Sequence, residues 1–426
     1  MPVDTIFALS SGAPPAAIGV IRISGPLARD ALISLTARLP PPRRATRRRL
    51  HQPGGELLDD ALVVWFPAPE SATGDDIAEI HCHGGRAVIA ALESALGALP
   101  GLRPAGPGEF TRRAFANGKL DLAEAEGLGD LLAAETELQR QSALAMAGGG
   151  FSREVEDWRD RLLIASASVE AVLDFADEDD VAQIPADFVK RLRGLENEVT
   201  KWLKRPRAEA LREGFRVVIA GPPNVGKSSL FNALVESEAA ITTPIAGTTR
   251  DVLSRPVALD GIPFTFVDTA GLHERSNDPI EVIGIGRARA EAARADLVLW
   301  LGEEGWGPSR AWEVQAQSDR PGHPVKQDPR HRVSAVTGQG LTGLRRDLVA
   351  LARTAMPRPG EAALNARQHR LLTEARLMLA SATELTDPLL VAEYLRLARV
   401  AFDVLVGRSA TEDLLDTLFA RFCIGK

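Results

Sequence analysis

The spacing of apolar residues changes along the chain, and each change predicts a different kind of structure. Between residues 1 and 117, short apolar and β-branched runs alternate with glycine and proline, as in strands separated by turns. Short helical stretches lie among them. The clearest strand-like runs are Ile18–Ile23, Leu62–Phe66 and Ala78–His81. The pattern predicts a compact α+β domain that ends near Asn117.

After Leu120 the apolar positions recur every three or four residues, which is the spacing of amphipathic helices. This pattern stops near Gly214 and resumes around Leu364, so an inserted block interrupts it. Insertions are accommodated at surface connections, where the two ends of the host domain lie close together. Two apolar stripes show the period: Trp158, Leu162, Ala165, Val169 and Val172, and Phe188, Leu192, Leu195, Val199 and Trp202.

We therefore predict a multidomain α/β protein made of four segments. They are an N-terminal α+β domain at 1–117, a first helical segment at 118–213, an inserted domain at 214–356 and a second helical segment at 357–426. The two helical segments together form one all-α domain. A length of 426 residues agrees with several domains, since one domain takes roughly 150 residues.

Composition narrows the class of protein. Hydrophobic residues make up 45% and charged residues 25%, and no apolar run approaches the roughly 20 residues that cross a bilayer. The start of the chain has no basic region followed by an apolar core, so we expect no secretory signal. Cys82 and Cys423 are far apart, which argues against a disulfide framework. We expect a cytoplasmic protein without a membrane span.

The net charge and the possible metal ligands give no clear evidence for a nucleic-acid site or a metal site. A net charge of -7 gives no general attraction to nucleic acid, so RNA contact would need a basic patch or a partner protein. The segment Pro40–Arg49 contains five arginines, and we interpret it as a solvated loop; a phosphate-contacting segment is the alternative. His81-Cys82-His83 suggests a metal site, but adjacent ligands rarely converge on one ion and no second pair at zinc spacing follows. We predict no zinc.

The inserted block begins with a phosphate-binding pattern. Gly221-Pro-Pro-Asn-Val-Gly-Lys-Ser228 follows the strand-like run Phe215–Ala220 and precedes the helix-like run Ser229–Leu234. In this order, glycines let backbone N–H groups approach phosphate oxygens, and the helix start adds partial positive charge. We expect Lys227 to neutralise the β- and γ-phosphates and Ser228 to bind Mg²⁺.

A second motif, Asp268-Thr-Ala-Gly271, follows the strand-like run Phe264–Val267. This order puts Asp268 at the carboxyl end of a strand beside the metal and Gly271 near the γ-phosphate. Between the two motifs, Thr249 lies where a switch segment closes over the nucleotide, and we expect it to be a second Mg²⁺ ligand. The pair of motifs predicts a GTP hydrolase with a Ras-like, doubly wound P-loop fold.

Guanine recognition is harder to locate, because the usual Asn-Lys-x-Asp is absent after the strand-like run Leu297–Leu301. Two degenerate candidates end at Asp319 and Asp328. We prefer Asp319, since Asp328 leaves little chain for the helix that normally precedes the last GTPase motif, here Ser334-Ala335. An aspartate accepts hydrogen bonds from guanine N1 and the exocyclic amine, whereas adenine would leave it unpaired. Loss of the Asn and Lys is expected to weaken nucleotide affinity.

The residue that usually positions the catalytic water in small GTPases is absent from this sequence. Leu272 stands where many small GTPases carry a water-positioning glutamine. Another polar group and another positive charge are therefore required. We hypothesise that Asn224 coordinates a monovalent cation with phosphate oxygens and that Glu281 orients water; for Glu281 a surface position is the alternative.

The order of these motifs resembles the tRNA modification GTPase family MnmE, also called TrmE, over nearly the whole chain. The terminal motif is the most specific. The segments that carry the resemblance are Asp4-Thr-Ile6, Ile21-Arg-Ile-Ser-Gly25, Glu79-Ile-His-Cys-His-Gly-Gly85, Pro107-Gly-Glu-Phe-Thr111, Asn117-Gly-Lys-Leu-Asp121, Ile245-Ala-Gly-Thr-Thr-Arg-Asp251 and Phe422-Cys-Ile-Gly-Lys426.

The resemblance implies an N-terminal domain that dimerises and binds a 5-formyl- or 5,10-methylene-tetrahydrofolate near the dimer interface. A carboxylate can accept from the N–H groups of a pterin, and Arg or Lys can pair with anionic groups. The resemblance also puts the Cys423 thiol near the folate, for one-carbon chemistry; a buried thiol is the alternative. The positions that match the family's folate contacts are Arg22, Glu79, Lys119 and Lys426.

The resemblance further implies K⁺-dependent hydrolysis. The matching K⁺ positions are Asn224, Thr243, Ile245 and Thr248. Glu281 matches the water-orienting glutamate, in a segment one residue longer here, and completes a catalytic set with Asn224 and Lys227. The expected GTP contacts are Asn224, Val225, Gly226, Lys227, Ser228, Ser229, Thr243, Pro244, Ile245, Ala246, Gly247, Thr248, Thr249, Asp268, Thr269, Ala270, Gly271, Asp319, Ser334 and Ala335.

By resemblance, the chain is expected to be a homodimer that works with the FAD-dependent protein MnmG, also called GidA, in a heterotetrameric or larger complex. Together they would install a 5-carboxymethylaminomethyl or aminomethyl group on the wobble uridine of certain tRNAs, using a folate one-carbon unit. In an alternative hypothesis, the GTPase is an assembly factor that times binding to ribosomal RNA. An ATPase is a third hypothesis.

Overall fold

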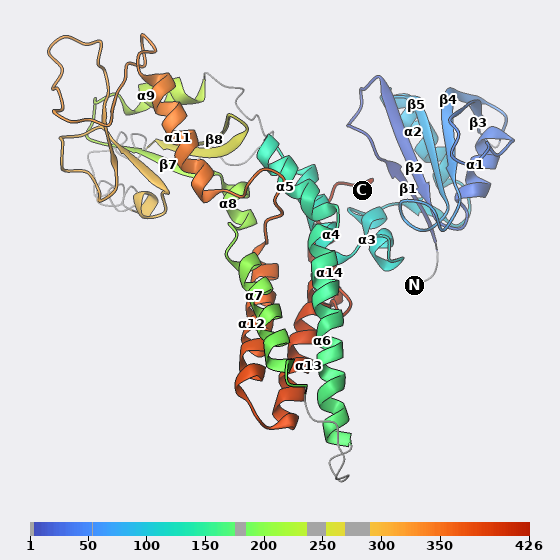
Figure 1. The fold of residues 1–426 in the computed structure, drawn as a ribbon. Coiled ribbons are helices and arrows are strands. Elements are labelled where there is room, and N and C mark those ends of the chain that lie inside the picture. Colours follow the sequence, from blue (N-terminus) through green and yellow to red (C-terminus); the bar gives the residue numbers. More distant parts are fainter. Residues whose placement is uncertain (1–3, 53, 175–184, 237–252, 269–289) are drawn as a thin grey trace, which may run out of the picture. The chain divides into compact units, whose positions relative to one another are not determined.

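The computed structural model describes residues 4–52, 54–174, 185–236, 253–268 and 290–426. Figure 1 shows the helices and strands of the chain, which divides into two compact units. The first contains residues 1–129, 152–159 and 402–426, and the second contains residues 130–151 and 160–401. The four segment boundaries drawn from the sequence remain predictions.

The first unit is built on a mixed sheet with the strand order β3-β4-β5-β2-β1-β6. Neighbouring strands are antiparallel except for β1 and β6, which are parallel. The strands are β1 (Thr5–Leu9), β2 (Ile18–Ser24), β3 (Thr46–His51), β4 (Leu57–Phe66), β5 (Ile77–His83) and β6 (Leu102–Pro104). The three strand-like runs of the sequence therefore correspond to β2, β4 and β5.

The two faces of this sheet differ because successive strand residues point to opposite sides. One face is buried under α1 (Ala28–Thr36) and α2 (Arg86–Gly97), and Ile21 and Ile80 belong to that core. On the other face, α3 (Glu109–Ala116) covers β1 through Phe110. The rest of that face carries polar side chains and exposed apolar ones.

The arginine-rich segment departs from the loop interpretation. Thr46–His51 forms β3, the strand at one edge of the sheet, so only the residues before Thr46 are outside regular strands. Arg47 and Arg49 are exposed while Leu50 is completely buried. The solvated-loop prediction was wrong for this half of the segment, because Leu50 anchors it to the core.

The end of the chain joins the first unit. α14 (Glu412–Phe419) packs with α4 (Leu122–Leu132) through a small apolar cluster that includes Phe422. The following tail forms a bridge between Ile424 and Pro107. Gly425 has a φ of +93°, and a Cβ there would lie 2.3 Å from the Leu9 carbonyl oxygen, so only glycine permits this close approach to β1.

The second unit contains most of the long helices. They are α5 (Glu137–Ala147), α7 (Phe188–Leu203), α12 (Ala366–Glu384) and the greater parts of α6 (Gly150–Asp174) and α13 (Pro388–Leu405). The predicted stripe on α7 is buried at Leu192, Leu195 and Val199, and α7 packs against α12. Phe151 and Trp202 lie with their ring centroids 4.9 Å apart.

The same unit holds a second sheet, with the strand order β12-β11-β10-β7-β9-β8. All neighbours are parallel except β8, which is antiparallel to β9. Its strands are β7 (Phe215–Ala220), β8 (Leu253–Leu259), β9 (Ile262–Asp268), β10 (Leu297–Trp300), β11 (Trp312–Gln315) and β12 (His331–Arg332), and the adjoining helices are α8 (Ala208–Glu213), α9 (Lys227–Val235) and α11 (Leu341–Ala355). The predicted fold class is confirmed.

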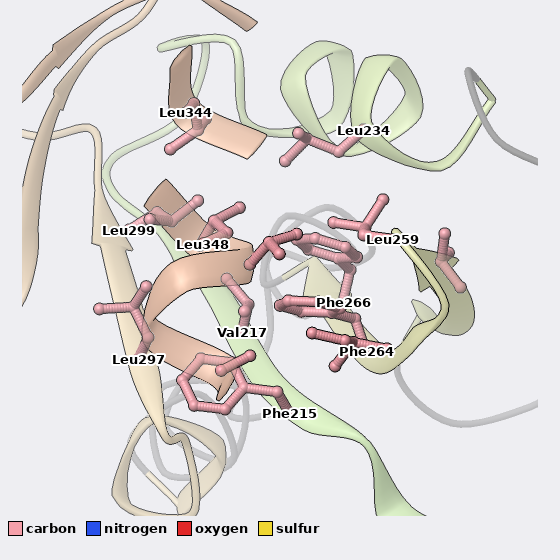
Figure 2. Close-up of a cluster of buried hydrophobic side chains, with 14 of the residues drawn as sticks. Phe215, Val217, Leu234, Leu259, Phe264, Phe266, Leu297, Leu299, Leu344 and Leu348 are labelled. Atoms are coloured by element: carbon pink, nitrogen blue, oxygen red, sulfur yellow. The ribbon is translucent and has the colours of Figure 1, made fainter. Parts of the chain in front are cut away.

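One face of this sheet forms the main core of the unit. Figure 2 shows Phe215, Phe264 and Phe266 from β7 and β9 gathered with leucines of the helices. Leu234 of α9 and Leu348 of α11 are completely buried there. This packing fixes α9, and with it the phosphate-binding loop, against the sheet.

Candidate functional site

The phosphate-binding pattern forms a loop between β7 and α9. Lys227 is the first residue of α9, so the N–H groups of the first helical turn face the loop. Lys227 is only 5% exposed, and its Nζ donates a hydrogen bond to the Pro222 carbonyl oxygen over 2.8 Å. Ser228 and Ser229 are exposed in the first turn. The loop thus offers backbone donors, an ammonium group and hydroxyl groups to an anion.

Asp268 is the last residue of β9 and is 1% exposed. It pairs in register with Ile219, next to the end of β7. The carboxyl ends of neighbouring parallel strands meet at one edge, so Asp268 lies beside the start of the loop that carries Ser228. A carboxylate and a hydroxyl are hard oxygen ligands, and the residues present suit Mg²⁺.

The candidate base-recognition residue Asp319 follows β11 and is exposed. The last motif follows β12, where the buried Ser334 accepts a hydrogen bond at Oγ from the Thr337 N–H over 3.0 Å. A backbone bond from Ser318 to Val333 joins the two loops. Asp328 lies in a loop before β12, where its N–H donates to Glu304.

A helix before the last motif does not distinguish Asp319 from Asp328, contrary to the expectation from the sequence. No helix separates Asp319 from Ser334, because residues 316–330, all described, contain no helical residue. Residues 301–311, between β10 and β11, also contain none. The buried Lys326 ties this region together by donating to the Trp300 carbonyl oxygen over 2.8 Å and pairing with Glu313. Asp319 lies in the loop that follows β11. This position, and not a helix after it, favours Asp319 over Asp328 for base recognition.

Sequence reasoning missed Gln317, which occupies the lysine position of the degenerate motif. Its Nε2 donates a hydrogen bond to the Asn224 carbonyl oxygen in the phosphate-binding loop over 3.3 Å. It also lies over Gly226, where an added Cβ would be 3.1 Å from that nitrogen. The only sequence signal was its place between Ala316 and Asp319.

Several predicted site residues lie outside the described residues, and their roles stay predictions. These are Thr243, Pro244, Ile245, Ala246, Gly247, Thr248, Thr249, Thr269, Ala270, Gly271, Leu272 and Glu281. Of the predicted K⁺ ligands, Asn224 is described: it has a φ of 63° and is exposed. Val225 and Ala335 are half-buried beside their motifs.

A second polar cluster lies on the open face of the first unit's sheet. Arg22 pairs in register with Glu79, and its Nη2 and Nε donate to Glu79 Oε1 over 2.8 and 3.0 Å. Glu79 Oε2 lies 3.4 Å from His81 Nε2, and the Arg22 guanidinium lies 5.8 Å from the ring centroid of Phe110. The structure thus brings two predicted folate residues into contact.

The other two predicted folate residues are less directly placed. Lys119 follows α3 and is exposed, while Lys426 is half-buried at the end of the tail that contacts Leu9. Within the described parts of the chain, no hydrogen bond or ion pair joins either lysine to Arg22 or Glu79. Among the described residues, hydrogen bonds and ion pairs therefore connect only two of the four positions, Arg22 and Glu79.

The two cysteines differ in solvent exposure. Cys423 is exposed, so the buried alternative is wrong; its carbonyl oxygen accepts from the Gly108 N–H over 3.4 Å, which holds the tail but leaves the thiol accessible. Cys82 is buried on the helix-covered face. Burial, with the nearby Asp59 charge, raises the pKa of the Cys82 thiol to about 11. Cys82 is therefore a protonated core residue.

Two protein-family models match adjacent stretches of the chain. The model described as GTP-binding protein TrmE N-terminus matches residues 5–119. The model described as MnmE helical domain matches residues 122–423, which is more than half of the 426 residues. The two matches meet between α3 and α4.

Curated relatives match from end to end. The tRNA modification GTPase MnmE of Erythrobacter litoralis (strain HTCC2594) is 62% identical over 423 residues, covering 99% of this chain and 100% of that protein. The protein of the same name from Novosphingobium aromaticivorans is 61% identical over 435 residues, with 99% and 100% covered. Among solved structures, the G domain of the T. maritima FeoB iron transporter matches 32% of this chain and 98% of that chain at 25% identity, with a TM-score of 0.23.

Proposed function

This chain belongs to the MnmE family of tRNA modification GTPases, and from that premise we propose that it is a K⁺-stimulated GTPase that, with an FAD-dependent partner, supports modification of the wobble uridine in certain tRNAs. It is a GTP-hydrolysing enzyme with a role in tRNA modification. The observation that carries the GTPase part of the proposal is the position of the Lys227 loop and Asp268 at the same edge of the second sheet. In the described residues, no helix has the length and apolar character needed to cross a bilayer. The family's role in tRNA modification supports a cytoplasmic location.

The proposed chemistry divides charge stabilisation among several groups. Lys227 and the N–H groups at the start of α9 would bind the β- and γ-phosphates. Ser228, with Asp268 nearby, would hold Mg²⁺, which would neutralise phosphate charge during hydrolysis. Asn224 would hold K⁺ with Thr243, Ile245 and Thr248, and Glu281 would orient the attacking water.

The K⁺ proposal predicts faster GTP turnover in K⁺ than in Na⁺ at equal ionic strength. A cation held at Asn224 would supply positive charge where charge develops, an effect of roughly ten- to a hundredfold. Steady-state phosphate release measures it. Asn224→Ala is expected to bring the K⁺ rate down to the Na⁺ rate. Equal turnover rates in K⁺ and Na⁺ for the unmodified protein would contradict the proposal that Asn224 binds K⁺.

For the one-carbon step, we propose that the first unit binds a tetrahydrofolate at Arg22 and Glu79, with Lys119 and Lys426 completing the site. A homodimer is supported by the exposed apolar side chains on the same open face: Ile18 is 59% and Leu62 48% exposed. Cys423 is accessible for a role near the folate. The FAD-dependent MnmG would supply the redox chemistry, in a complex that also binds tRNA.

Nucleoside analysis of tRNA tests the tRNA proposal directly. Deleting the gene is expected to remove 5-carboxymethylaminomethyl and aminomethyl groups from wobble uridines, because no one-carbon unit would reach C5. A plasmid copy of the unmodified gene should restore them. Unchanged wobble uridines, with ribosomal RNA precursors accumulating, would favour the assembly-factor alternative.

A further inference from the structure

The edge strand β3 and the residues just before it carry the densest group of positive charges in the chain. Five arginines lie within residues 43–49, no acidic residue lies among them, and no other stretch of that length contains as many basic residues. Figure 1 shows β3 at the edge of the first unit's sheet. All five are exposed except the half-buried Arg48. The β3 arginine patch consists of Arg43, Arg44, Arg47, Arg48 and Arg49.

The exposed side chains of this patch are available to an outside partner. Among the described residues, no hydrogen bond or ion pair holds the side chain of Arg44 or Arg49. Arg47 pairs with Asp60 over 2.6 Å, but its side chain is 79% exposed, and exposed ion pairs are weak. Arg47 can therefore exchange the Asp60 carboxylate for another anion.

Protection of the sheet edge does not account for the patch. Charged residues on an edge strand prevent it from pairing with another sheet, and a charge of either sign serves that purpose. Here every charge is positive, in a chain whose net charge is -7. The neighbouring strand β4 offers only two carboxylates, and that of Asp59 is already bound by His83. The local excess of positive charge indicates a partner that is an anion.

The patch lies on the same sheet as the polar cluster of Arg22 and Glu79. Arg47 is opposite Leu62 of β4, and Leu62 is opposite His81 of β5, so the three side chains point to the same open face. β5 and β2, which carry Glu79 and Arg22, are the second and third strands from β3. With strands about 4.8 Å apart, the cluster lies about 10–15 Å from the edge. An anionic chain held at β3 would therefore pass near the cluster.

We propose that the β3 arginine patch is an RNA-binding surface that contacts the phosphate backbone of tRNA. Guanidinium groups pair with phosphate oxygens, and an edge strand adds backbone N–H donors along its open side. Such contacts hold and orient an RNA without reading its sequence. This inference rests on the proposed function and adds to it the place where the substrate is held, on the sheet that carries the folate cluster.

The test is the affinity of the full-length protein for a fluorescently labelled tRNA transcript, measured by anisotropy at about 50 to 200 mM salt. A triple variant, Arg44→Gln, Arg47→Gln and Arg49→Gln, removes three exposed charges and should weaken binding roughly ten- to a hundredfold at about 0.1 M salt. The dependence of log K on log salt concentration should become shallower by about two to three, since each phosphate contact contributes about 0.7–0.9. Transcripts with and without a modifiable wobble uridine should respond alike, because phosphate contacts carry no sequence information.

The matched control removes three exposed basic residues from α7 in the second unit: Lys190→Gln, Arg193→Gln and Lys201→Gln. It changes the net charge equally and should alter tRNA affinity by less than about threefold. Replacing the same three β3 arginines by lysine keeps the charge and should also stay within about threefold of the unmodified protein. Size-exclusion chromatography of the glutamine variant should show an unchanged oligomeric state, which rules out association through the altered edge.

Unchanged affinity and salt dependence in the β3 glutamine variant would overturn the inference, and so would an equal loss in the α7 control. Absence of tRNA binding by the unmodified protein would overturn it as well. Binding to phosphatidylserine vesicles that depends on these arginines, without tRNA binding, would assign the patch to a membrane surface instead. The proposed function has separate readouts, because an unmodified protein that neither binds tetrahydrofolate nor hydrolyses GTP would contradict it whatever the patch binds.

Discussion

Replacing Lys227 by Ala is expected to reduce kcat/KM for GTP by roughly a thousandfold. The ammonium group is held at the start of α9, where the N–H groups of the first helical turn also point, so both act on the same anion. Its Nζ donates to the Pro222 carbonyl oxygen and would exchange that partner for phosphate when nucleotide binds. Alanine has no charge to offer the transition state.

Phosphate release with saturating Mg²⁺ and K⁺ measures this loss. Lys190→Ala on α7 removes an equally charged but exposed side chain and should leave turnover unchanged. Thermal unfolding without nucleotide tests whether the Lys227 variant is folded, so that a loss of structure is not mistaken for a loss of phosphate binding. Turnover within about tenfold of the unmodified protein would contradict a phosphate role for Lys227.

The second large effect is expected at the carboxylate of the first unit. Glu79→Gln should weaken tetrahydrofolate binding by roughly ten- to a hundredfold, because hydrogen bonds to a charged acceptor are worth about 1.5–3 kcal/mol. Glu79 Oε1 holds Arg22 and Oε2 faces His81, so the carboxylate sits at the centre of the polar cluster. Glutamine keeps the size of the side chain and one acceptor for Arg22, which limits the change to charge and one oxygen.

Equilibrium dialysis of the full-length protein with 5-formyl-tetrahydrofolate gives the affinities. Glu93→Gln is the control, since Glu93 lies on α2, which covers the opposite face of the sheet. Equal affinity in the Glu79 variant, with binding intact in the unmodified protein, would move the folate site away from this cluster. GTP turnover should be unaffected by either substitution, because both residues lie in the other compact unit.

The sequence alone was enough for features that are local in the chain. The phosphate-binding loop was predictable because a strand, a glycine-containing turn and a helix start follow one another within Phe215–Val235. The strands β2, β4 and β5 were predictable from runs of apolar and β-branched residues. Each of these signals depends on backbone preferences and periodicity over a few residues to a few tens of residues.

Long-range contacts were beyond those signals. Arg22 and Glu79 were marked as folate residues by resemblance, but their ion pair depends on the register of β2 with β5, 57 residues apart. Exposure of Cys423 depends on a tail whose Gly425 packs against β1 at the far end of the chain. The edge strand β3 depends on pairing with β4 and on burial of Leu50 in the core, and the local arginine-rich sequence indicates neither.

The second sheet shows the same division. The sequence determined that residues 214–356 carry a P-loop, because that motif is a continuous stretch of chain. Only the tertiary structure decided how the base-recognition region is built: β11 and β12 are joined without a helix, and Gln317 contacts Asn224 across 93 residues. A single amide in a degenerate motif has no pattern of its own, and its role depends on which loop the folded chain brings within hydrogen-bond distance.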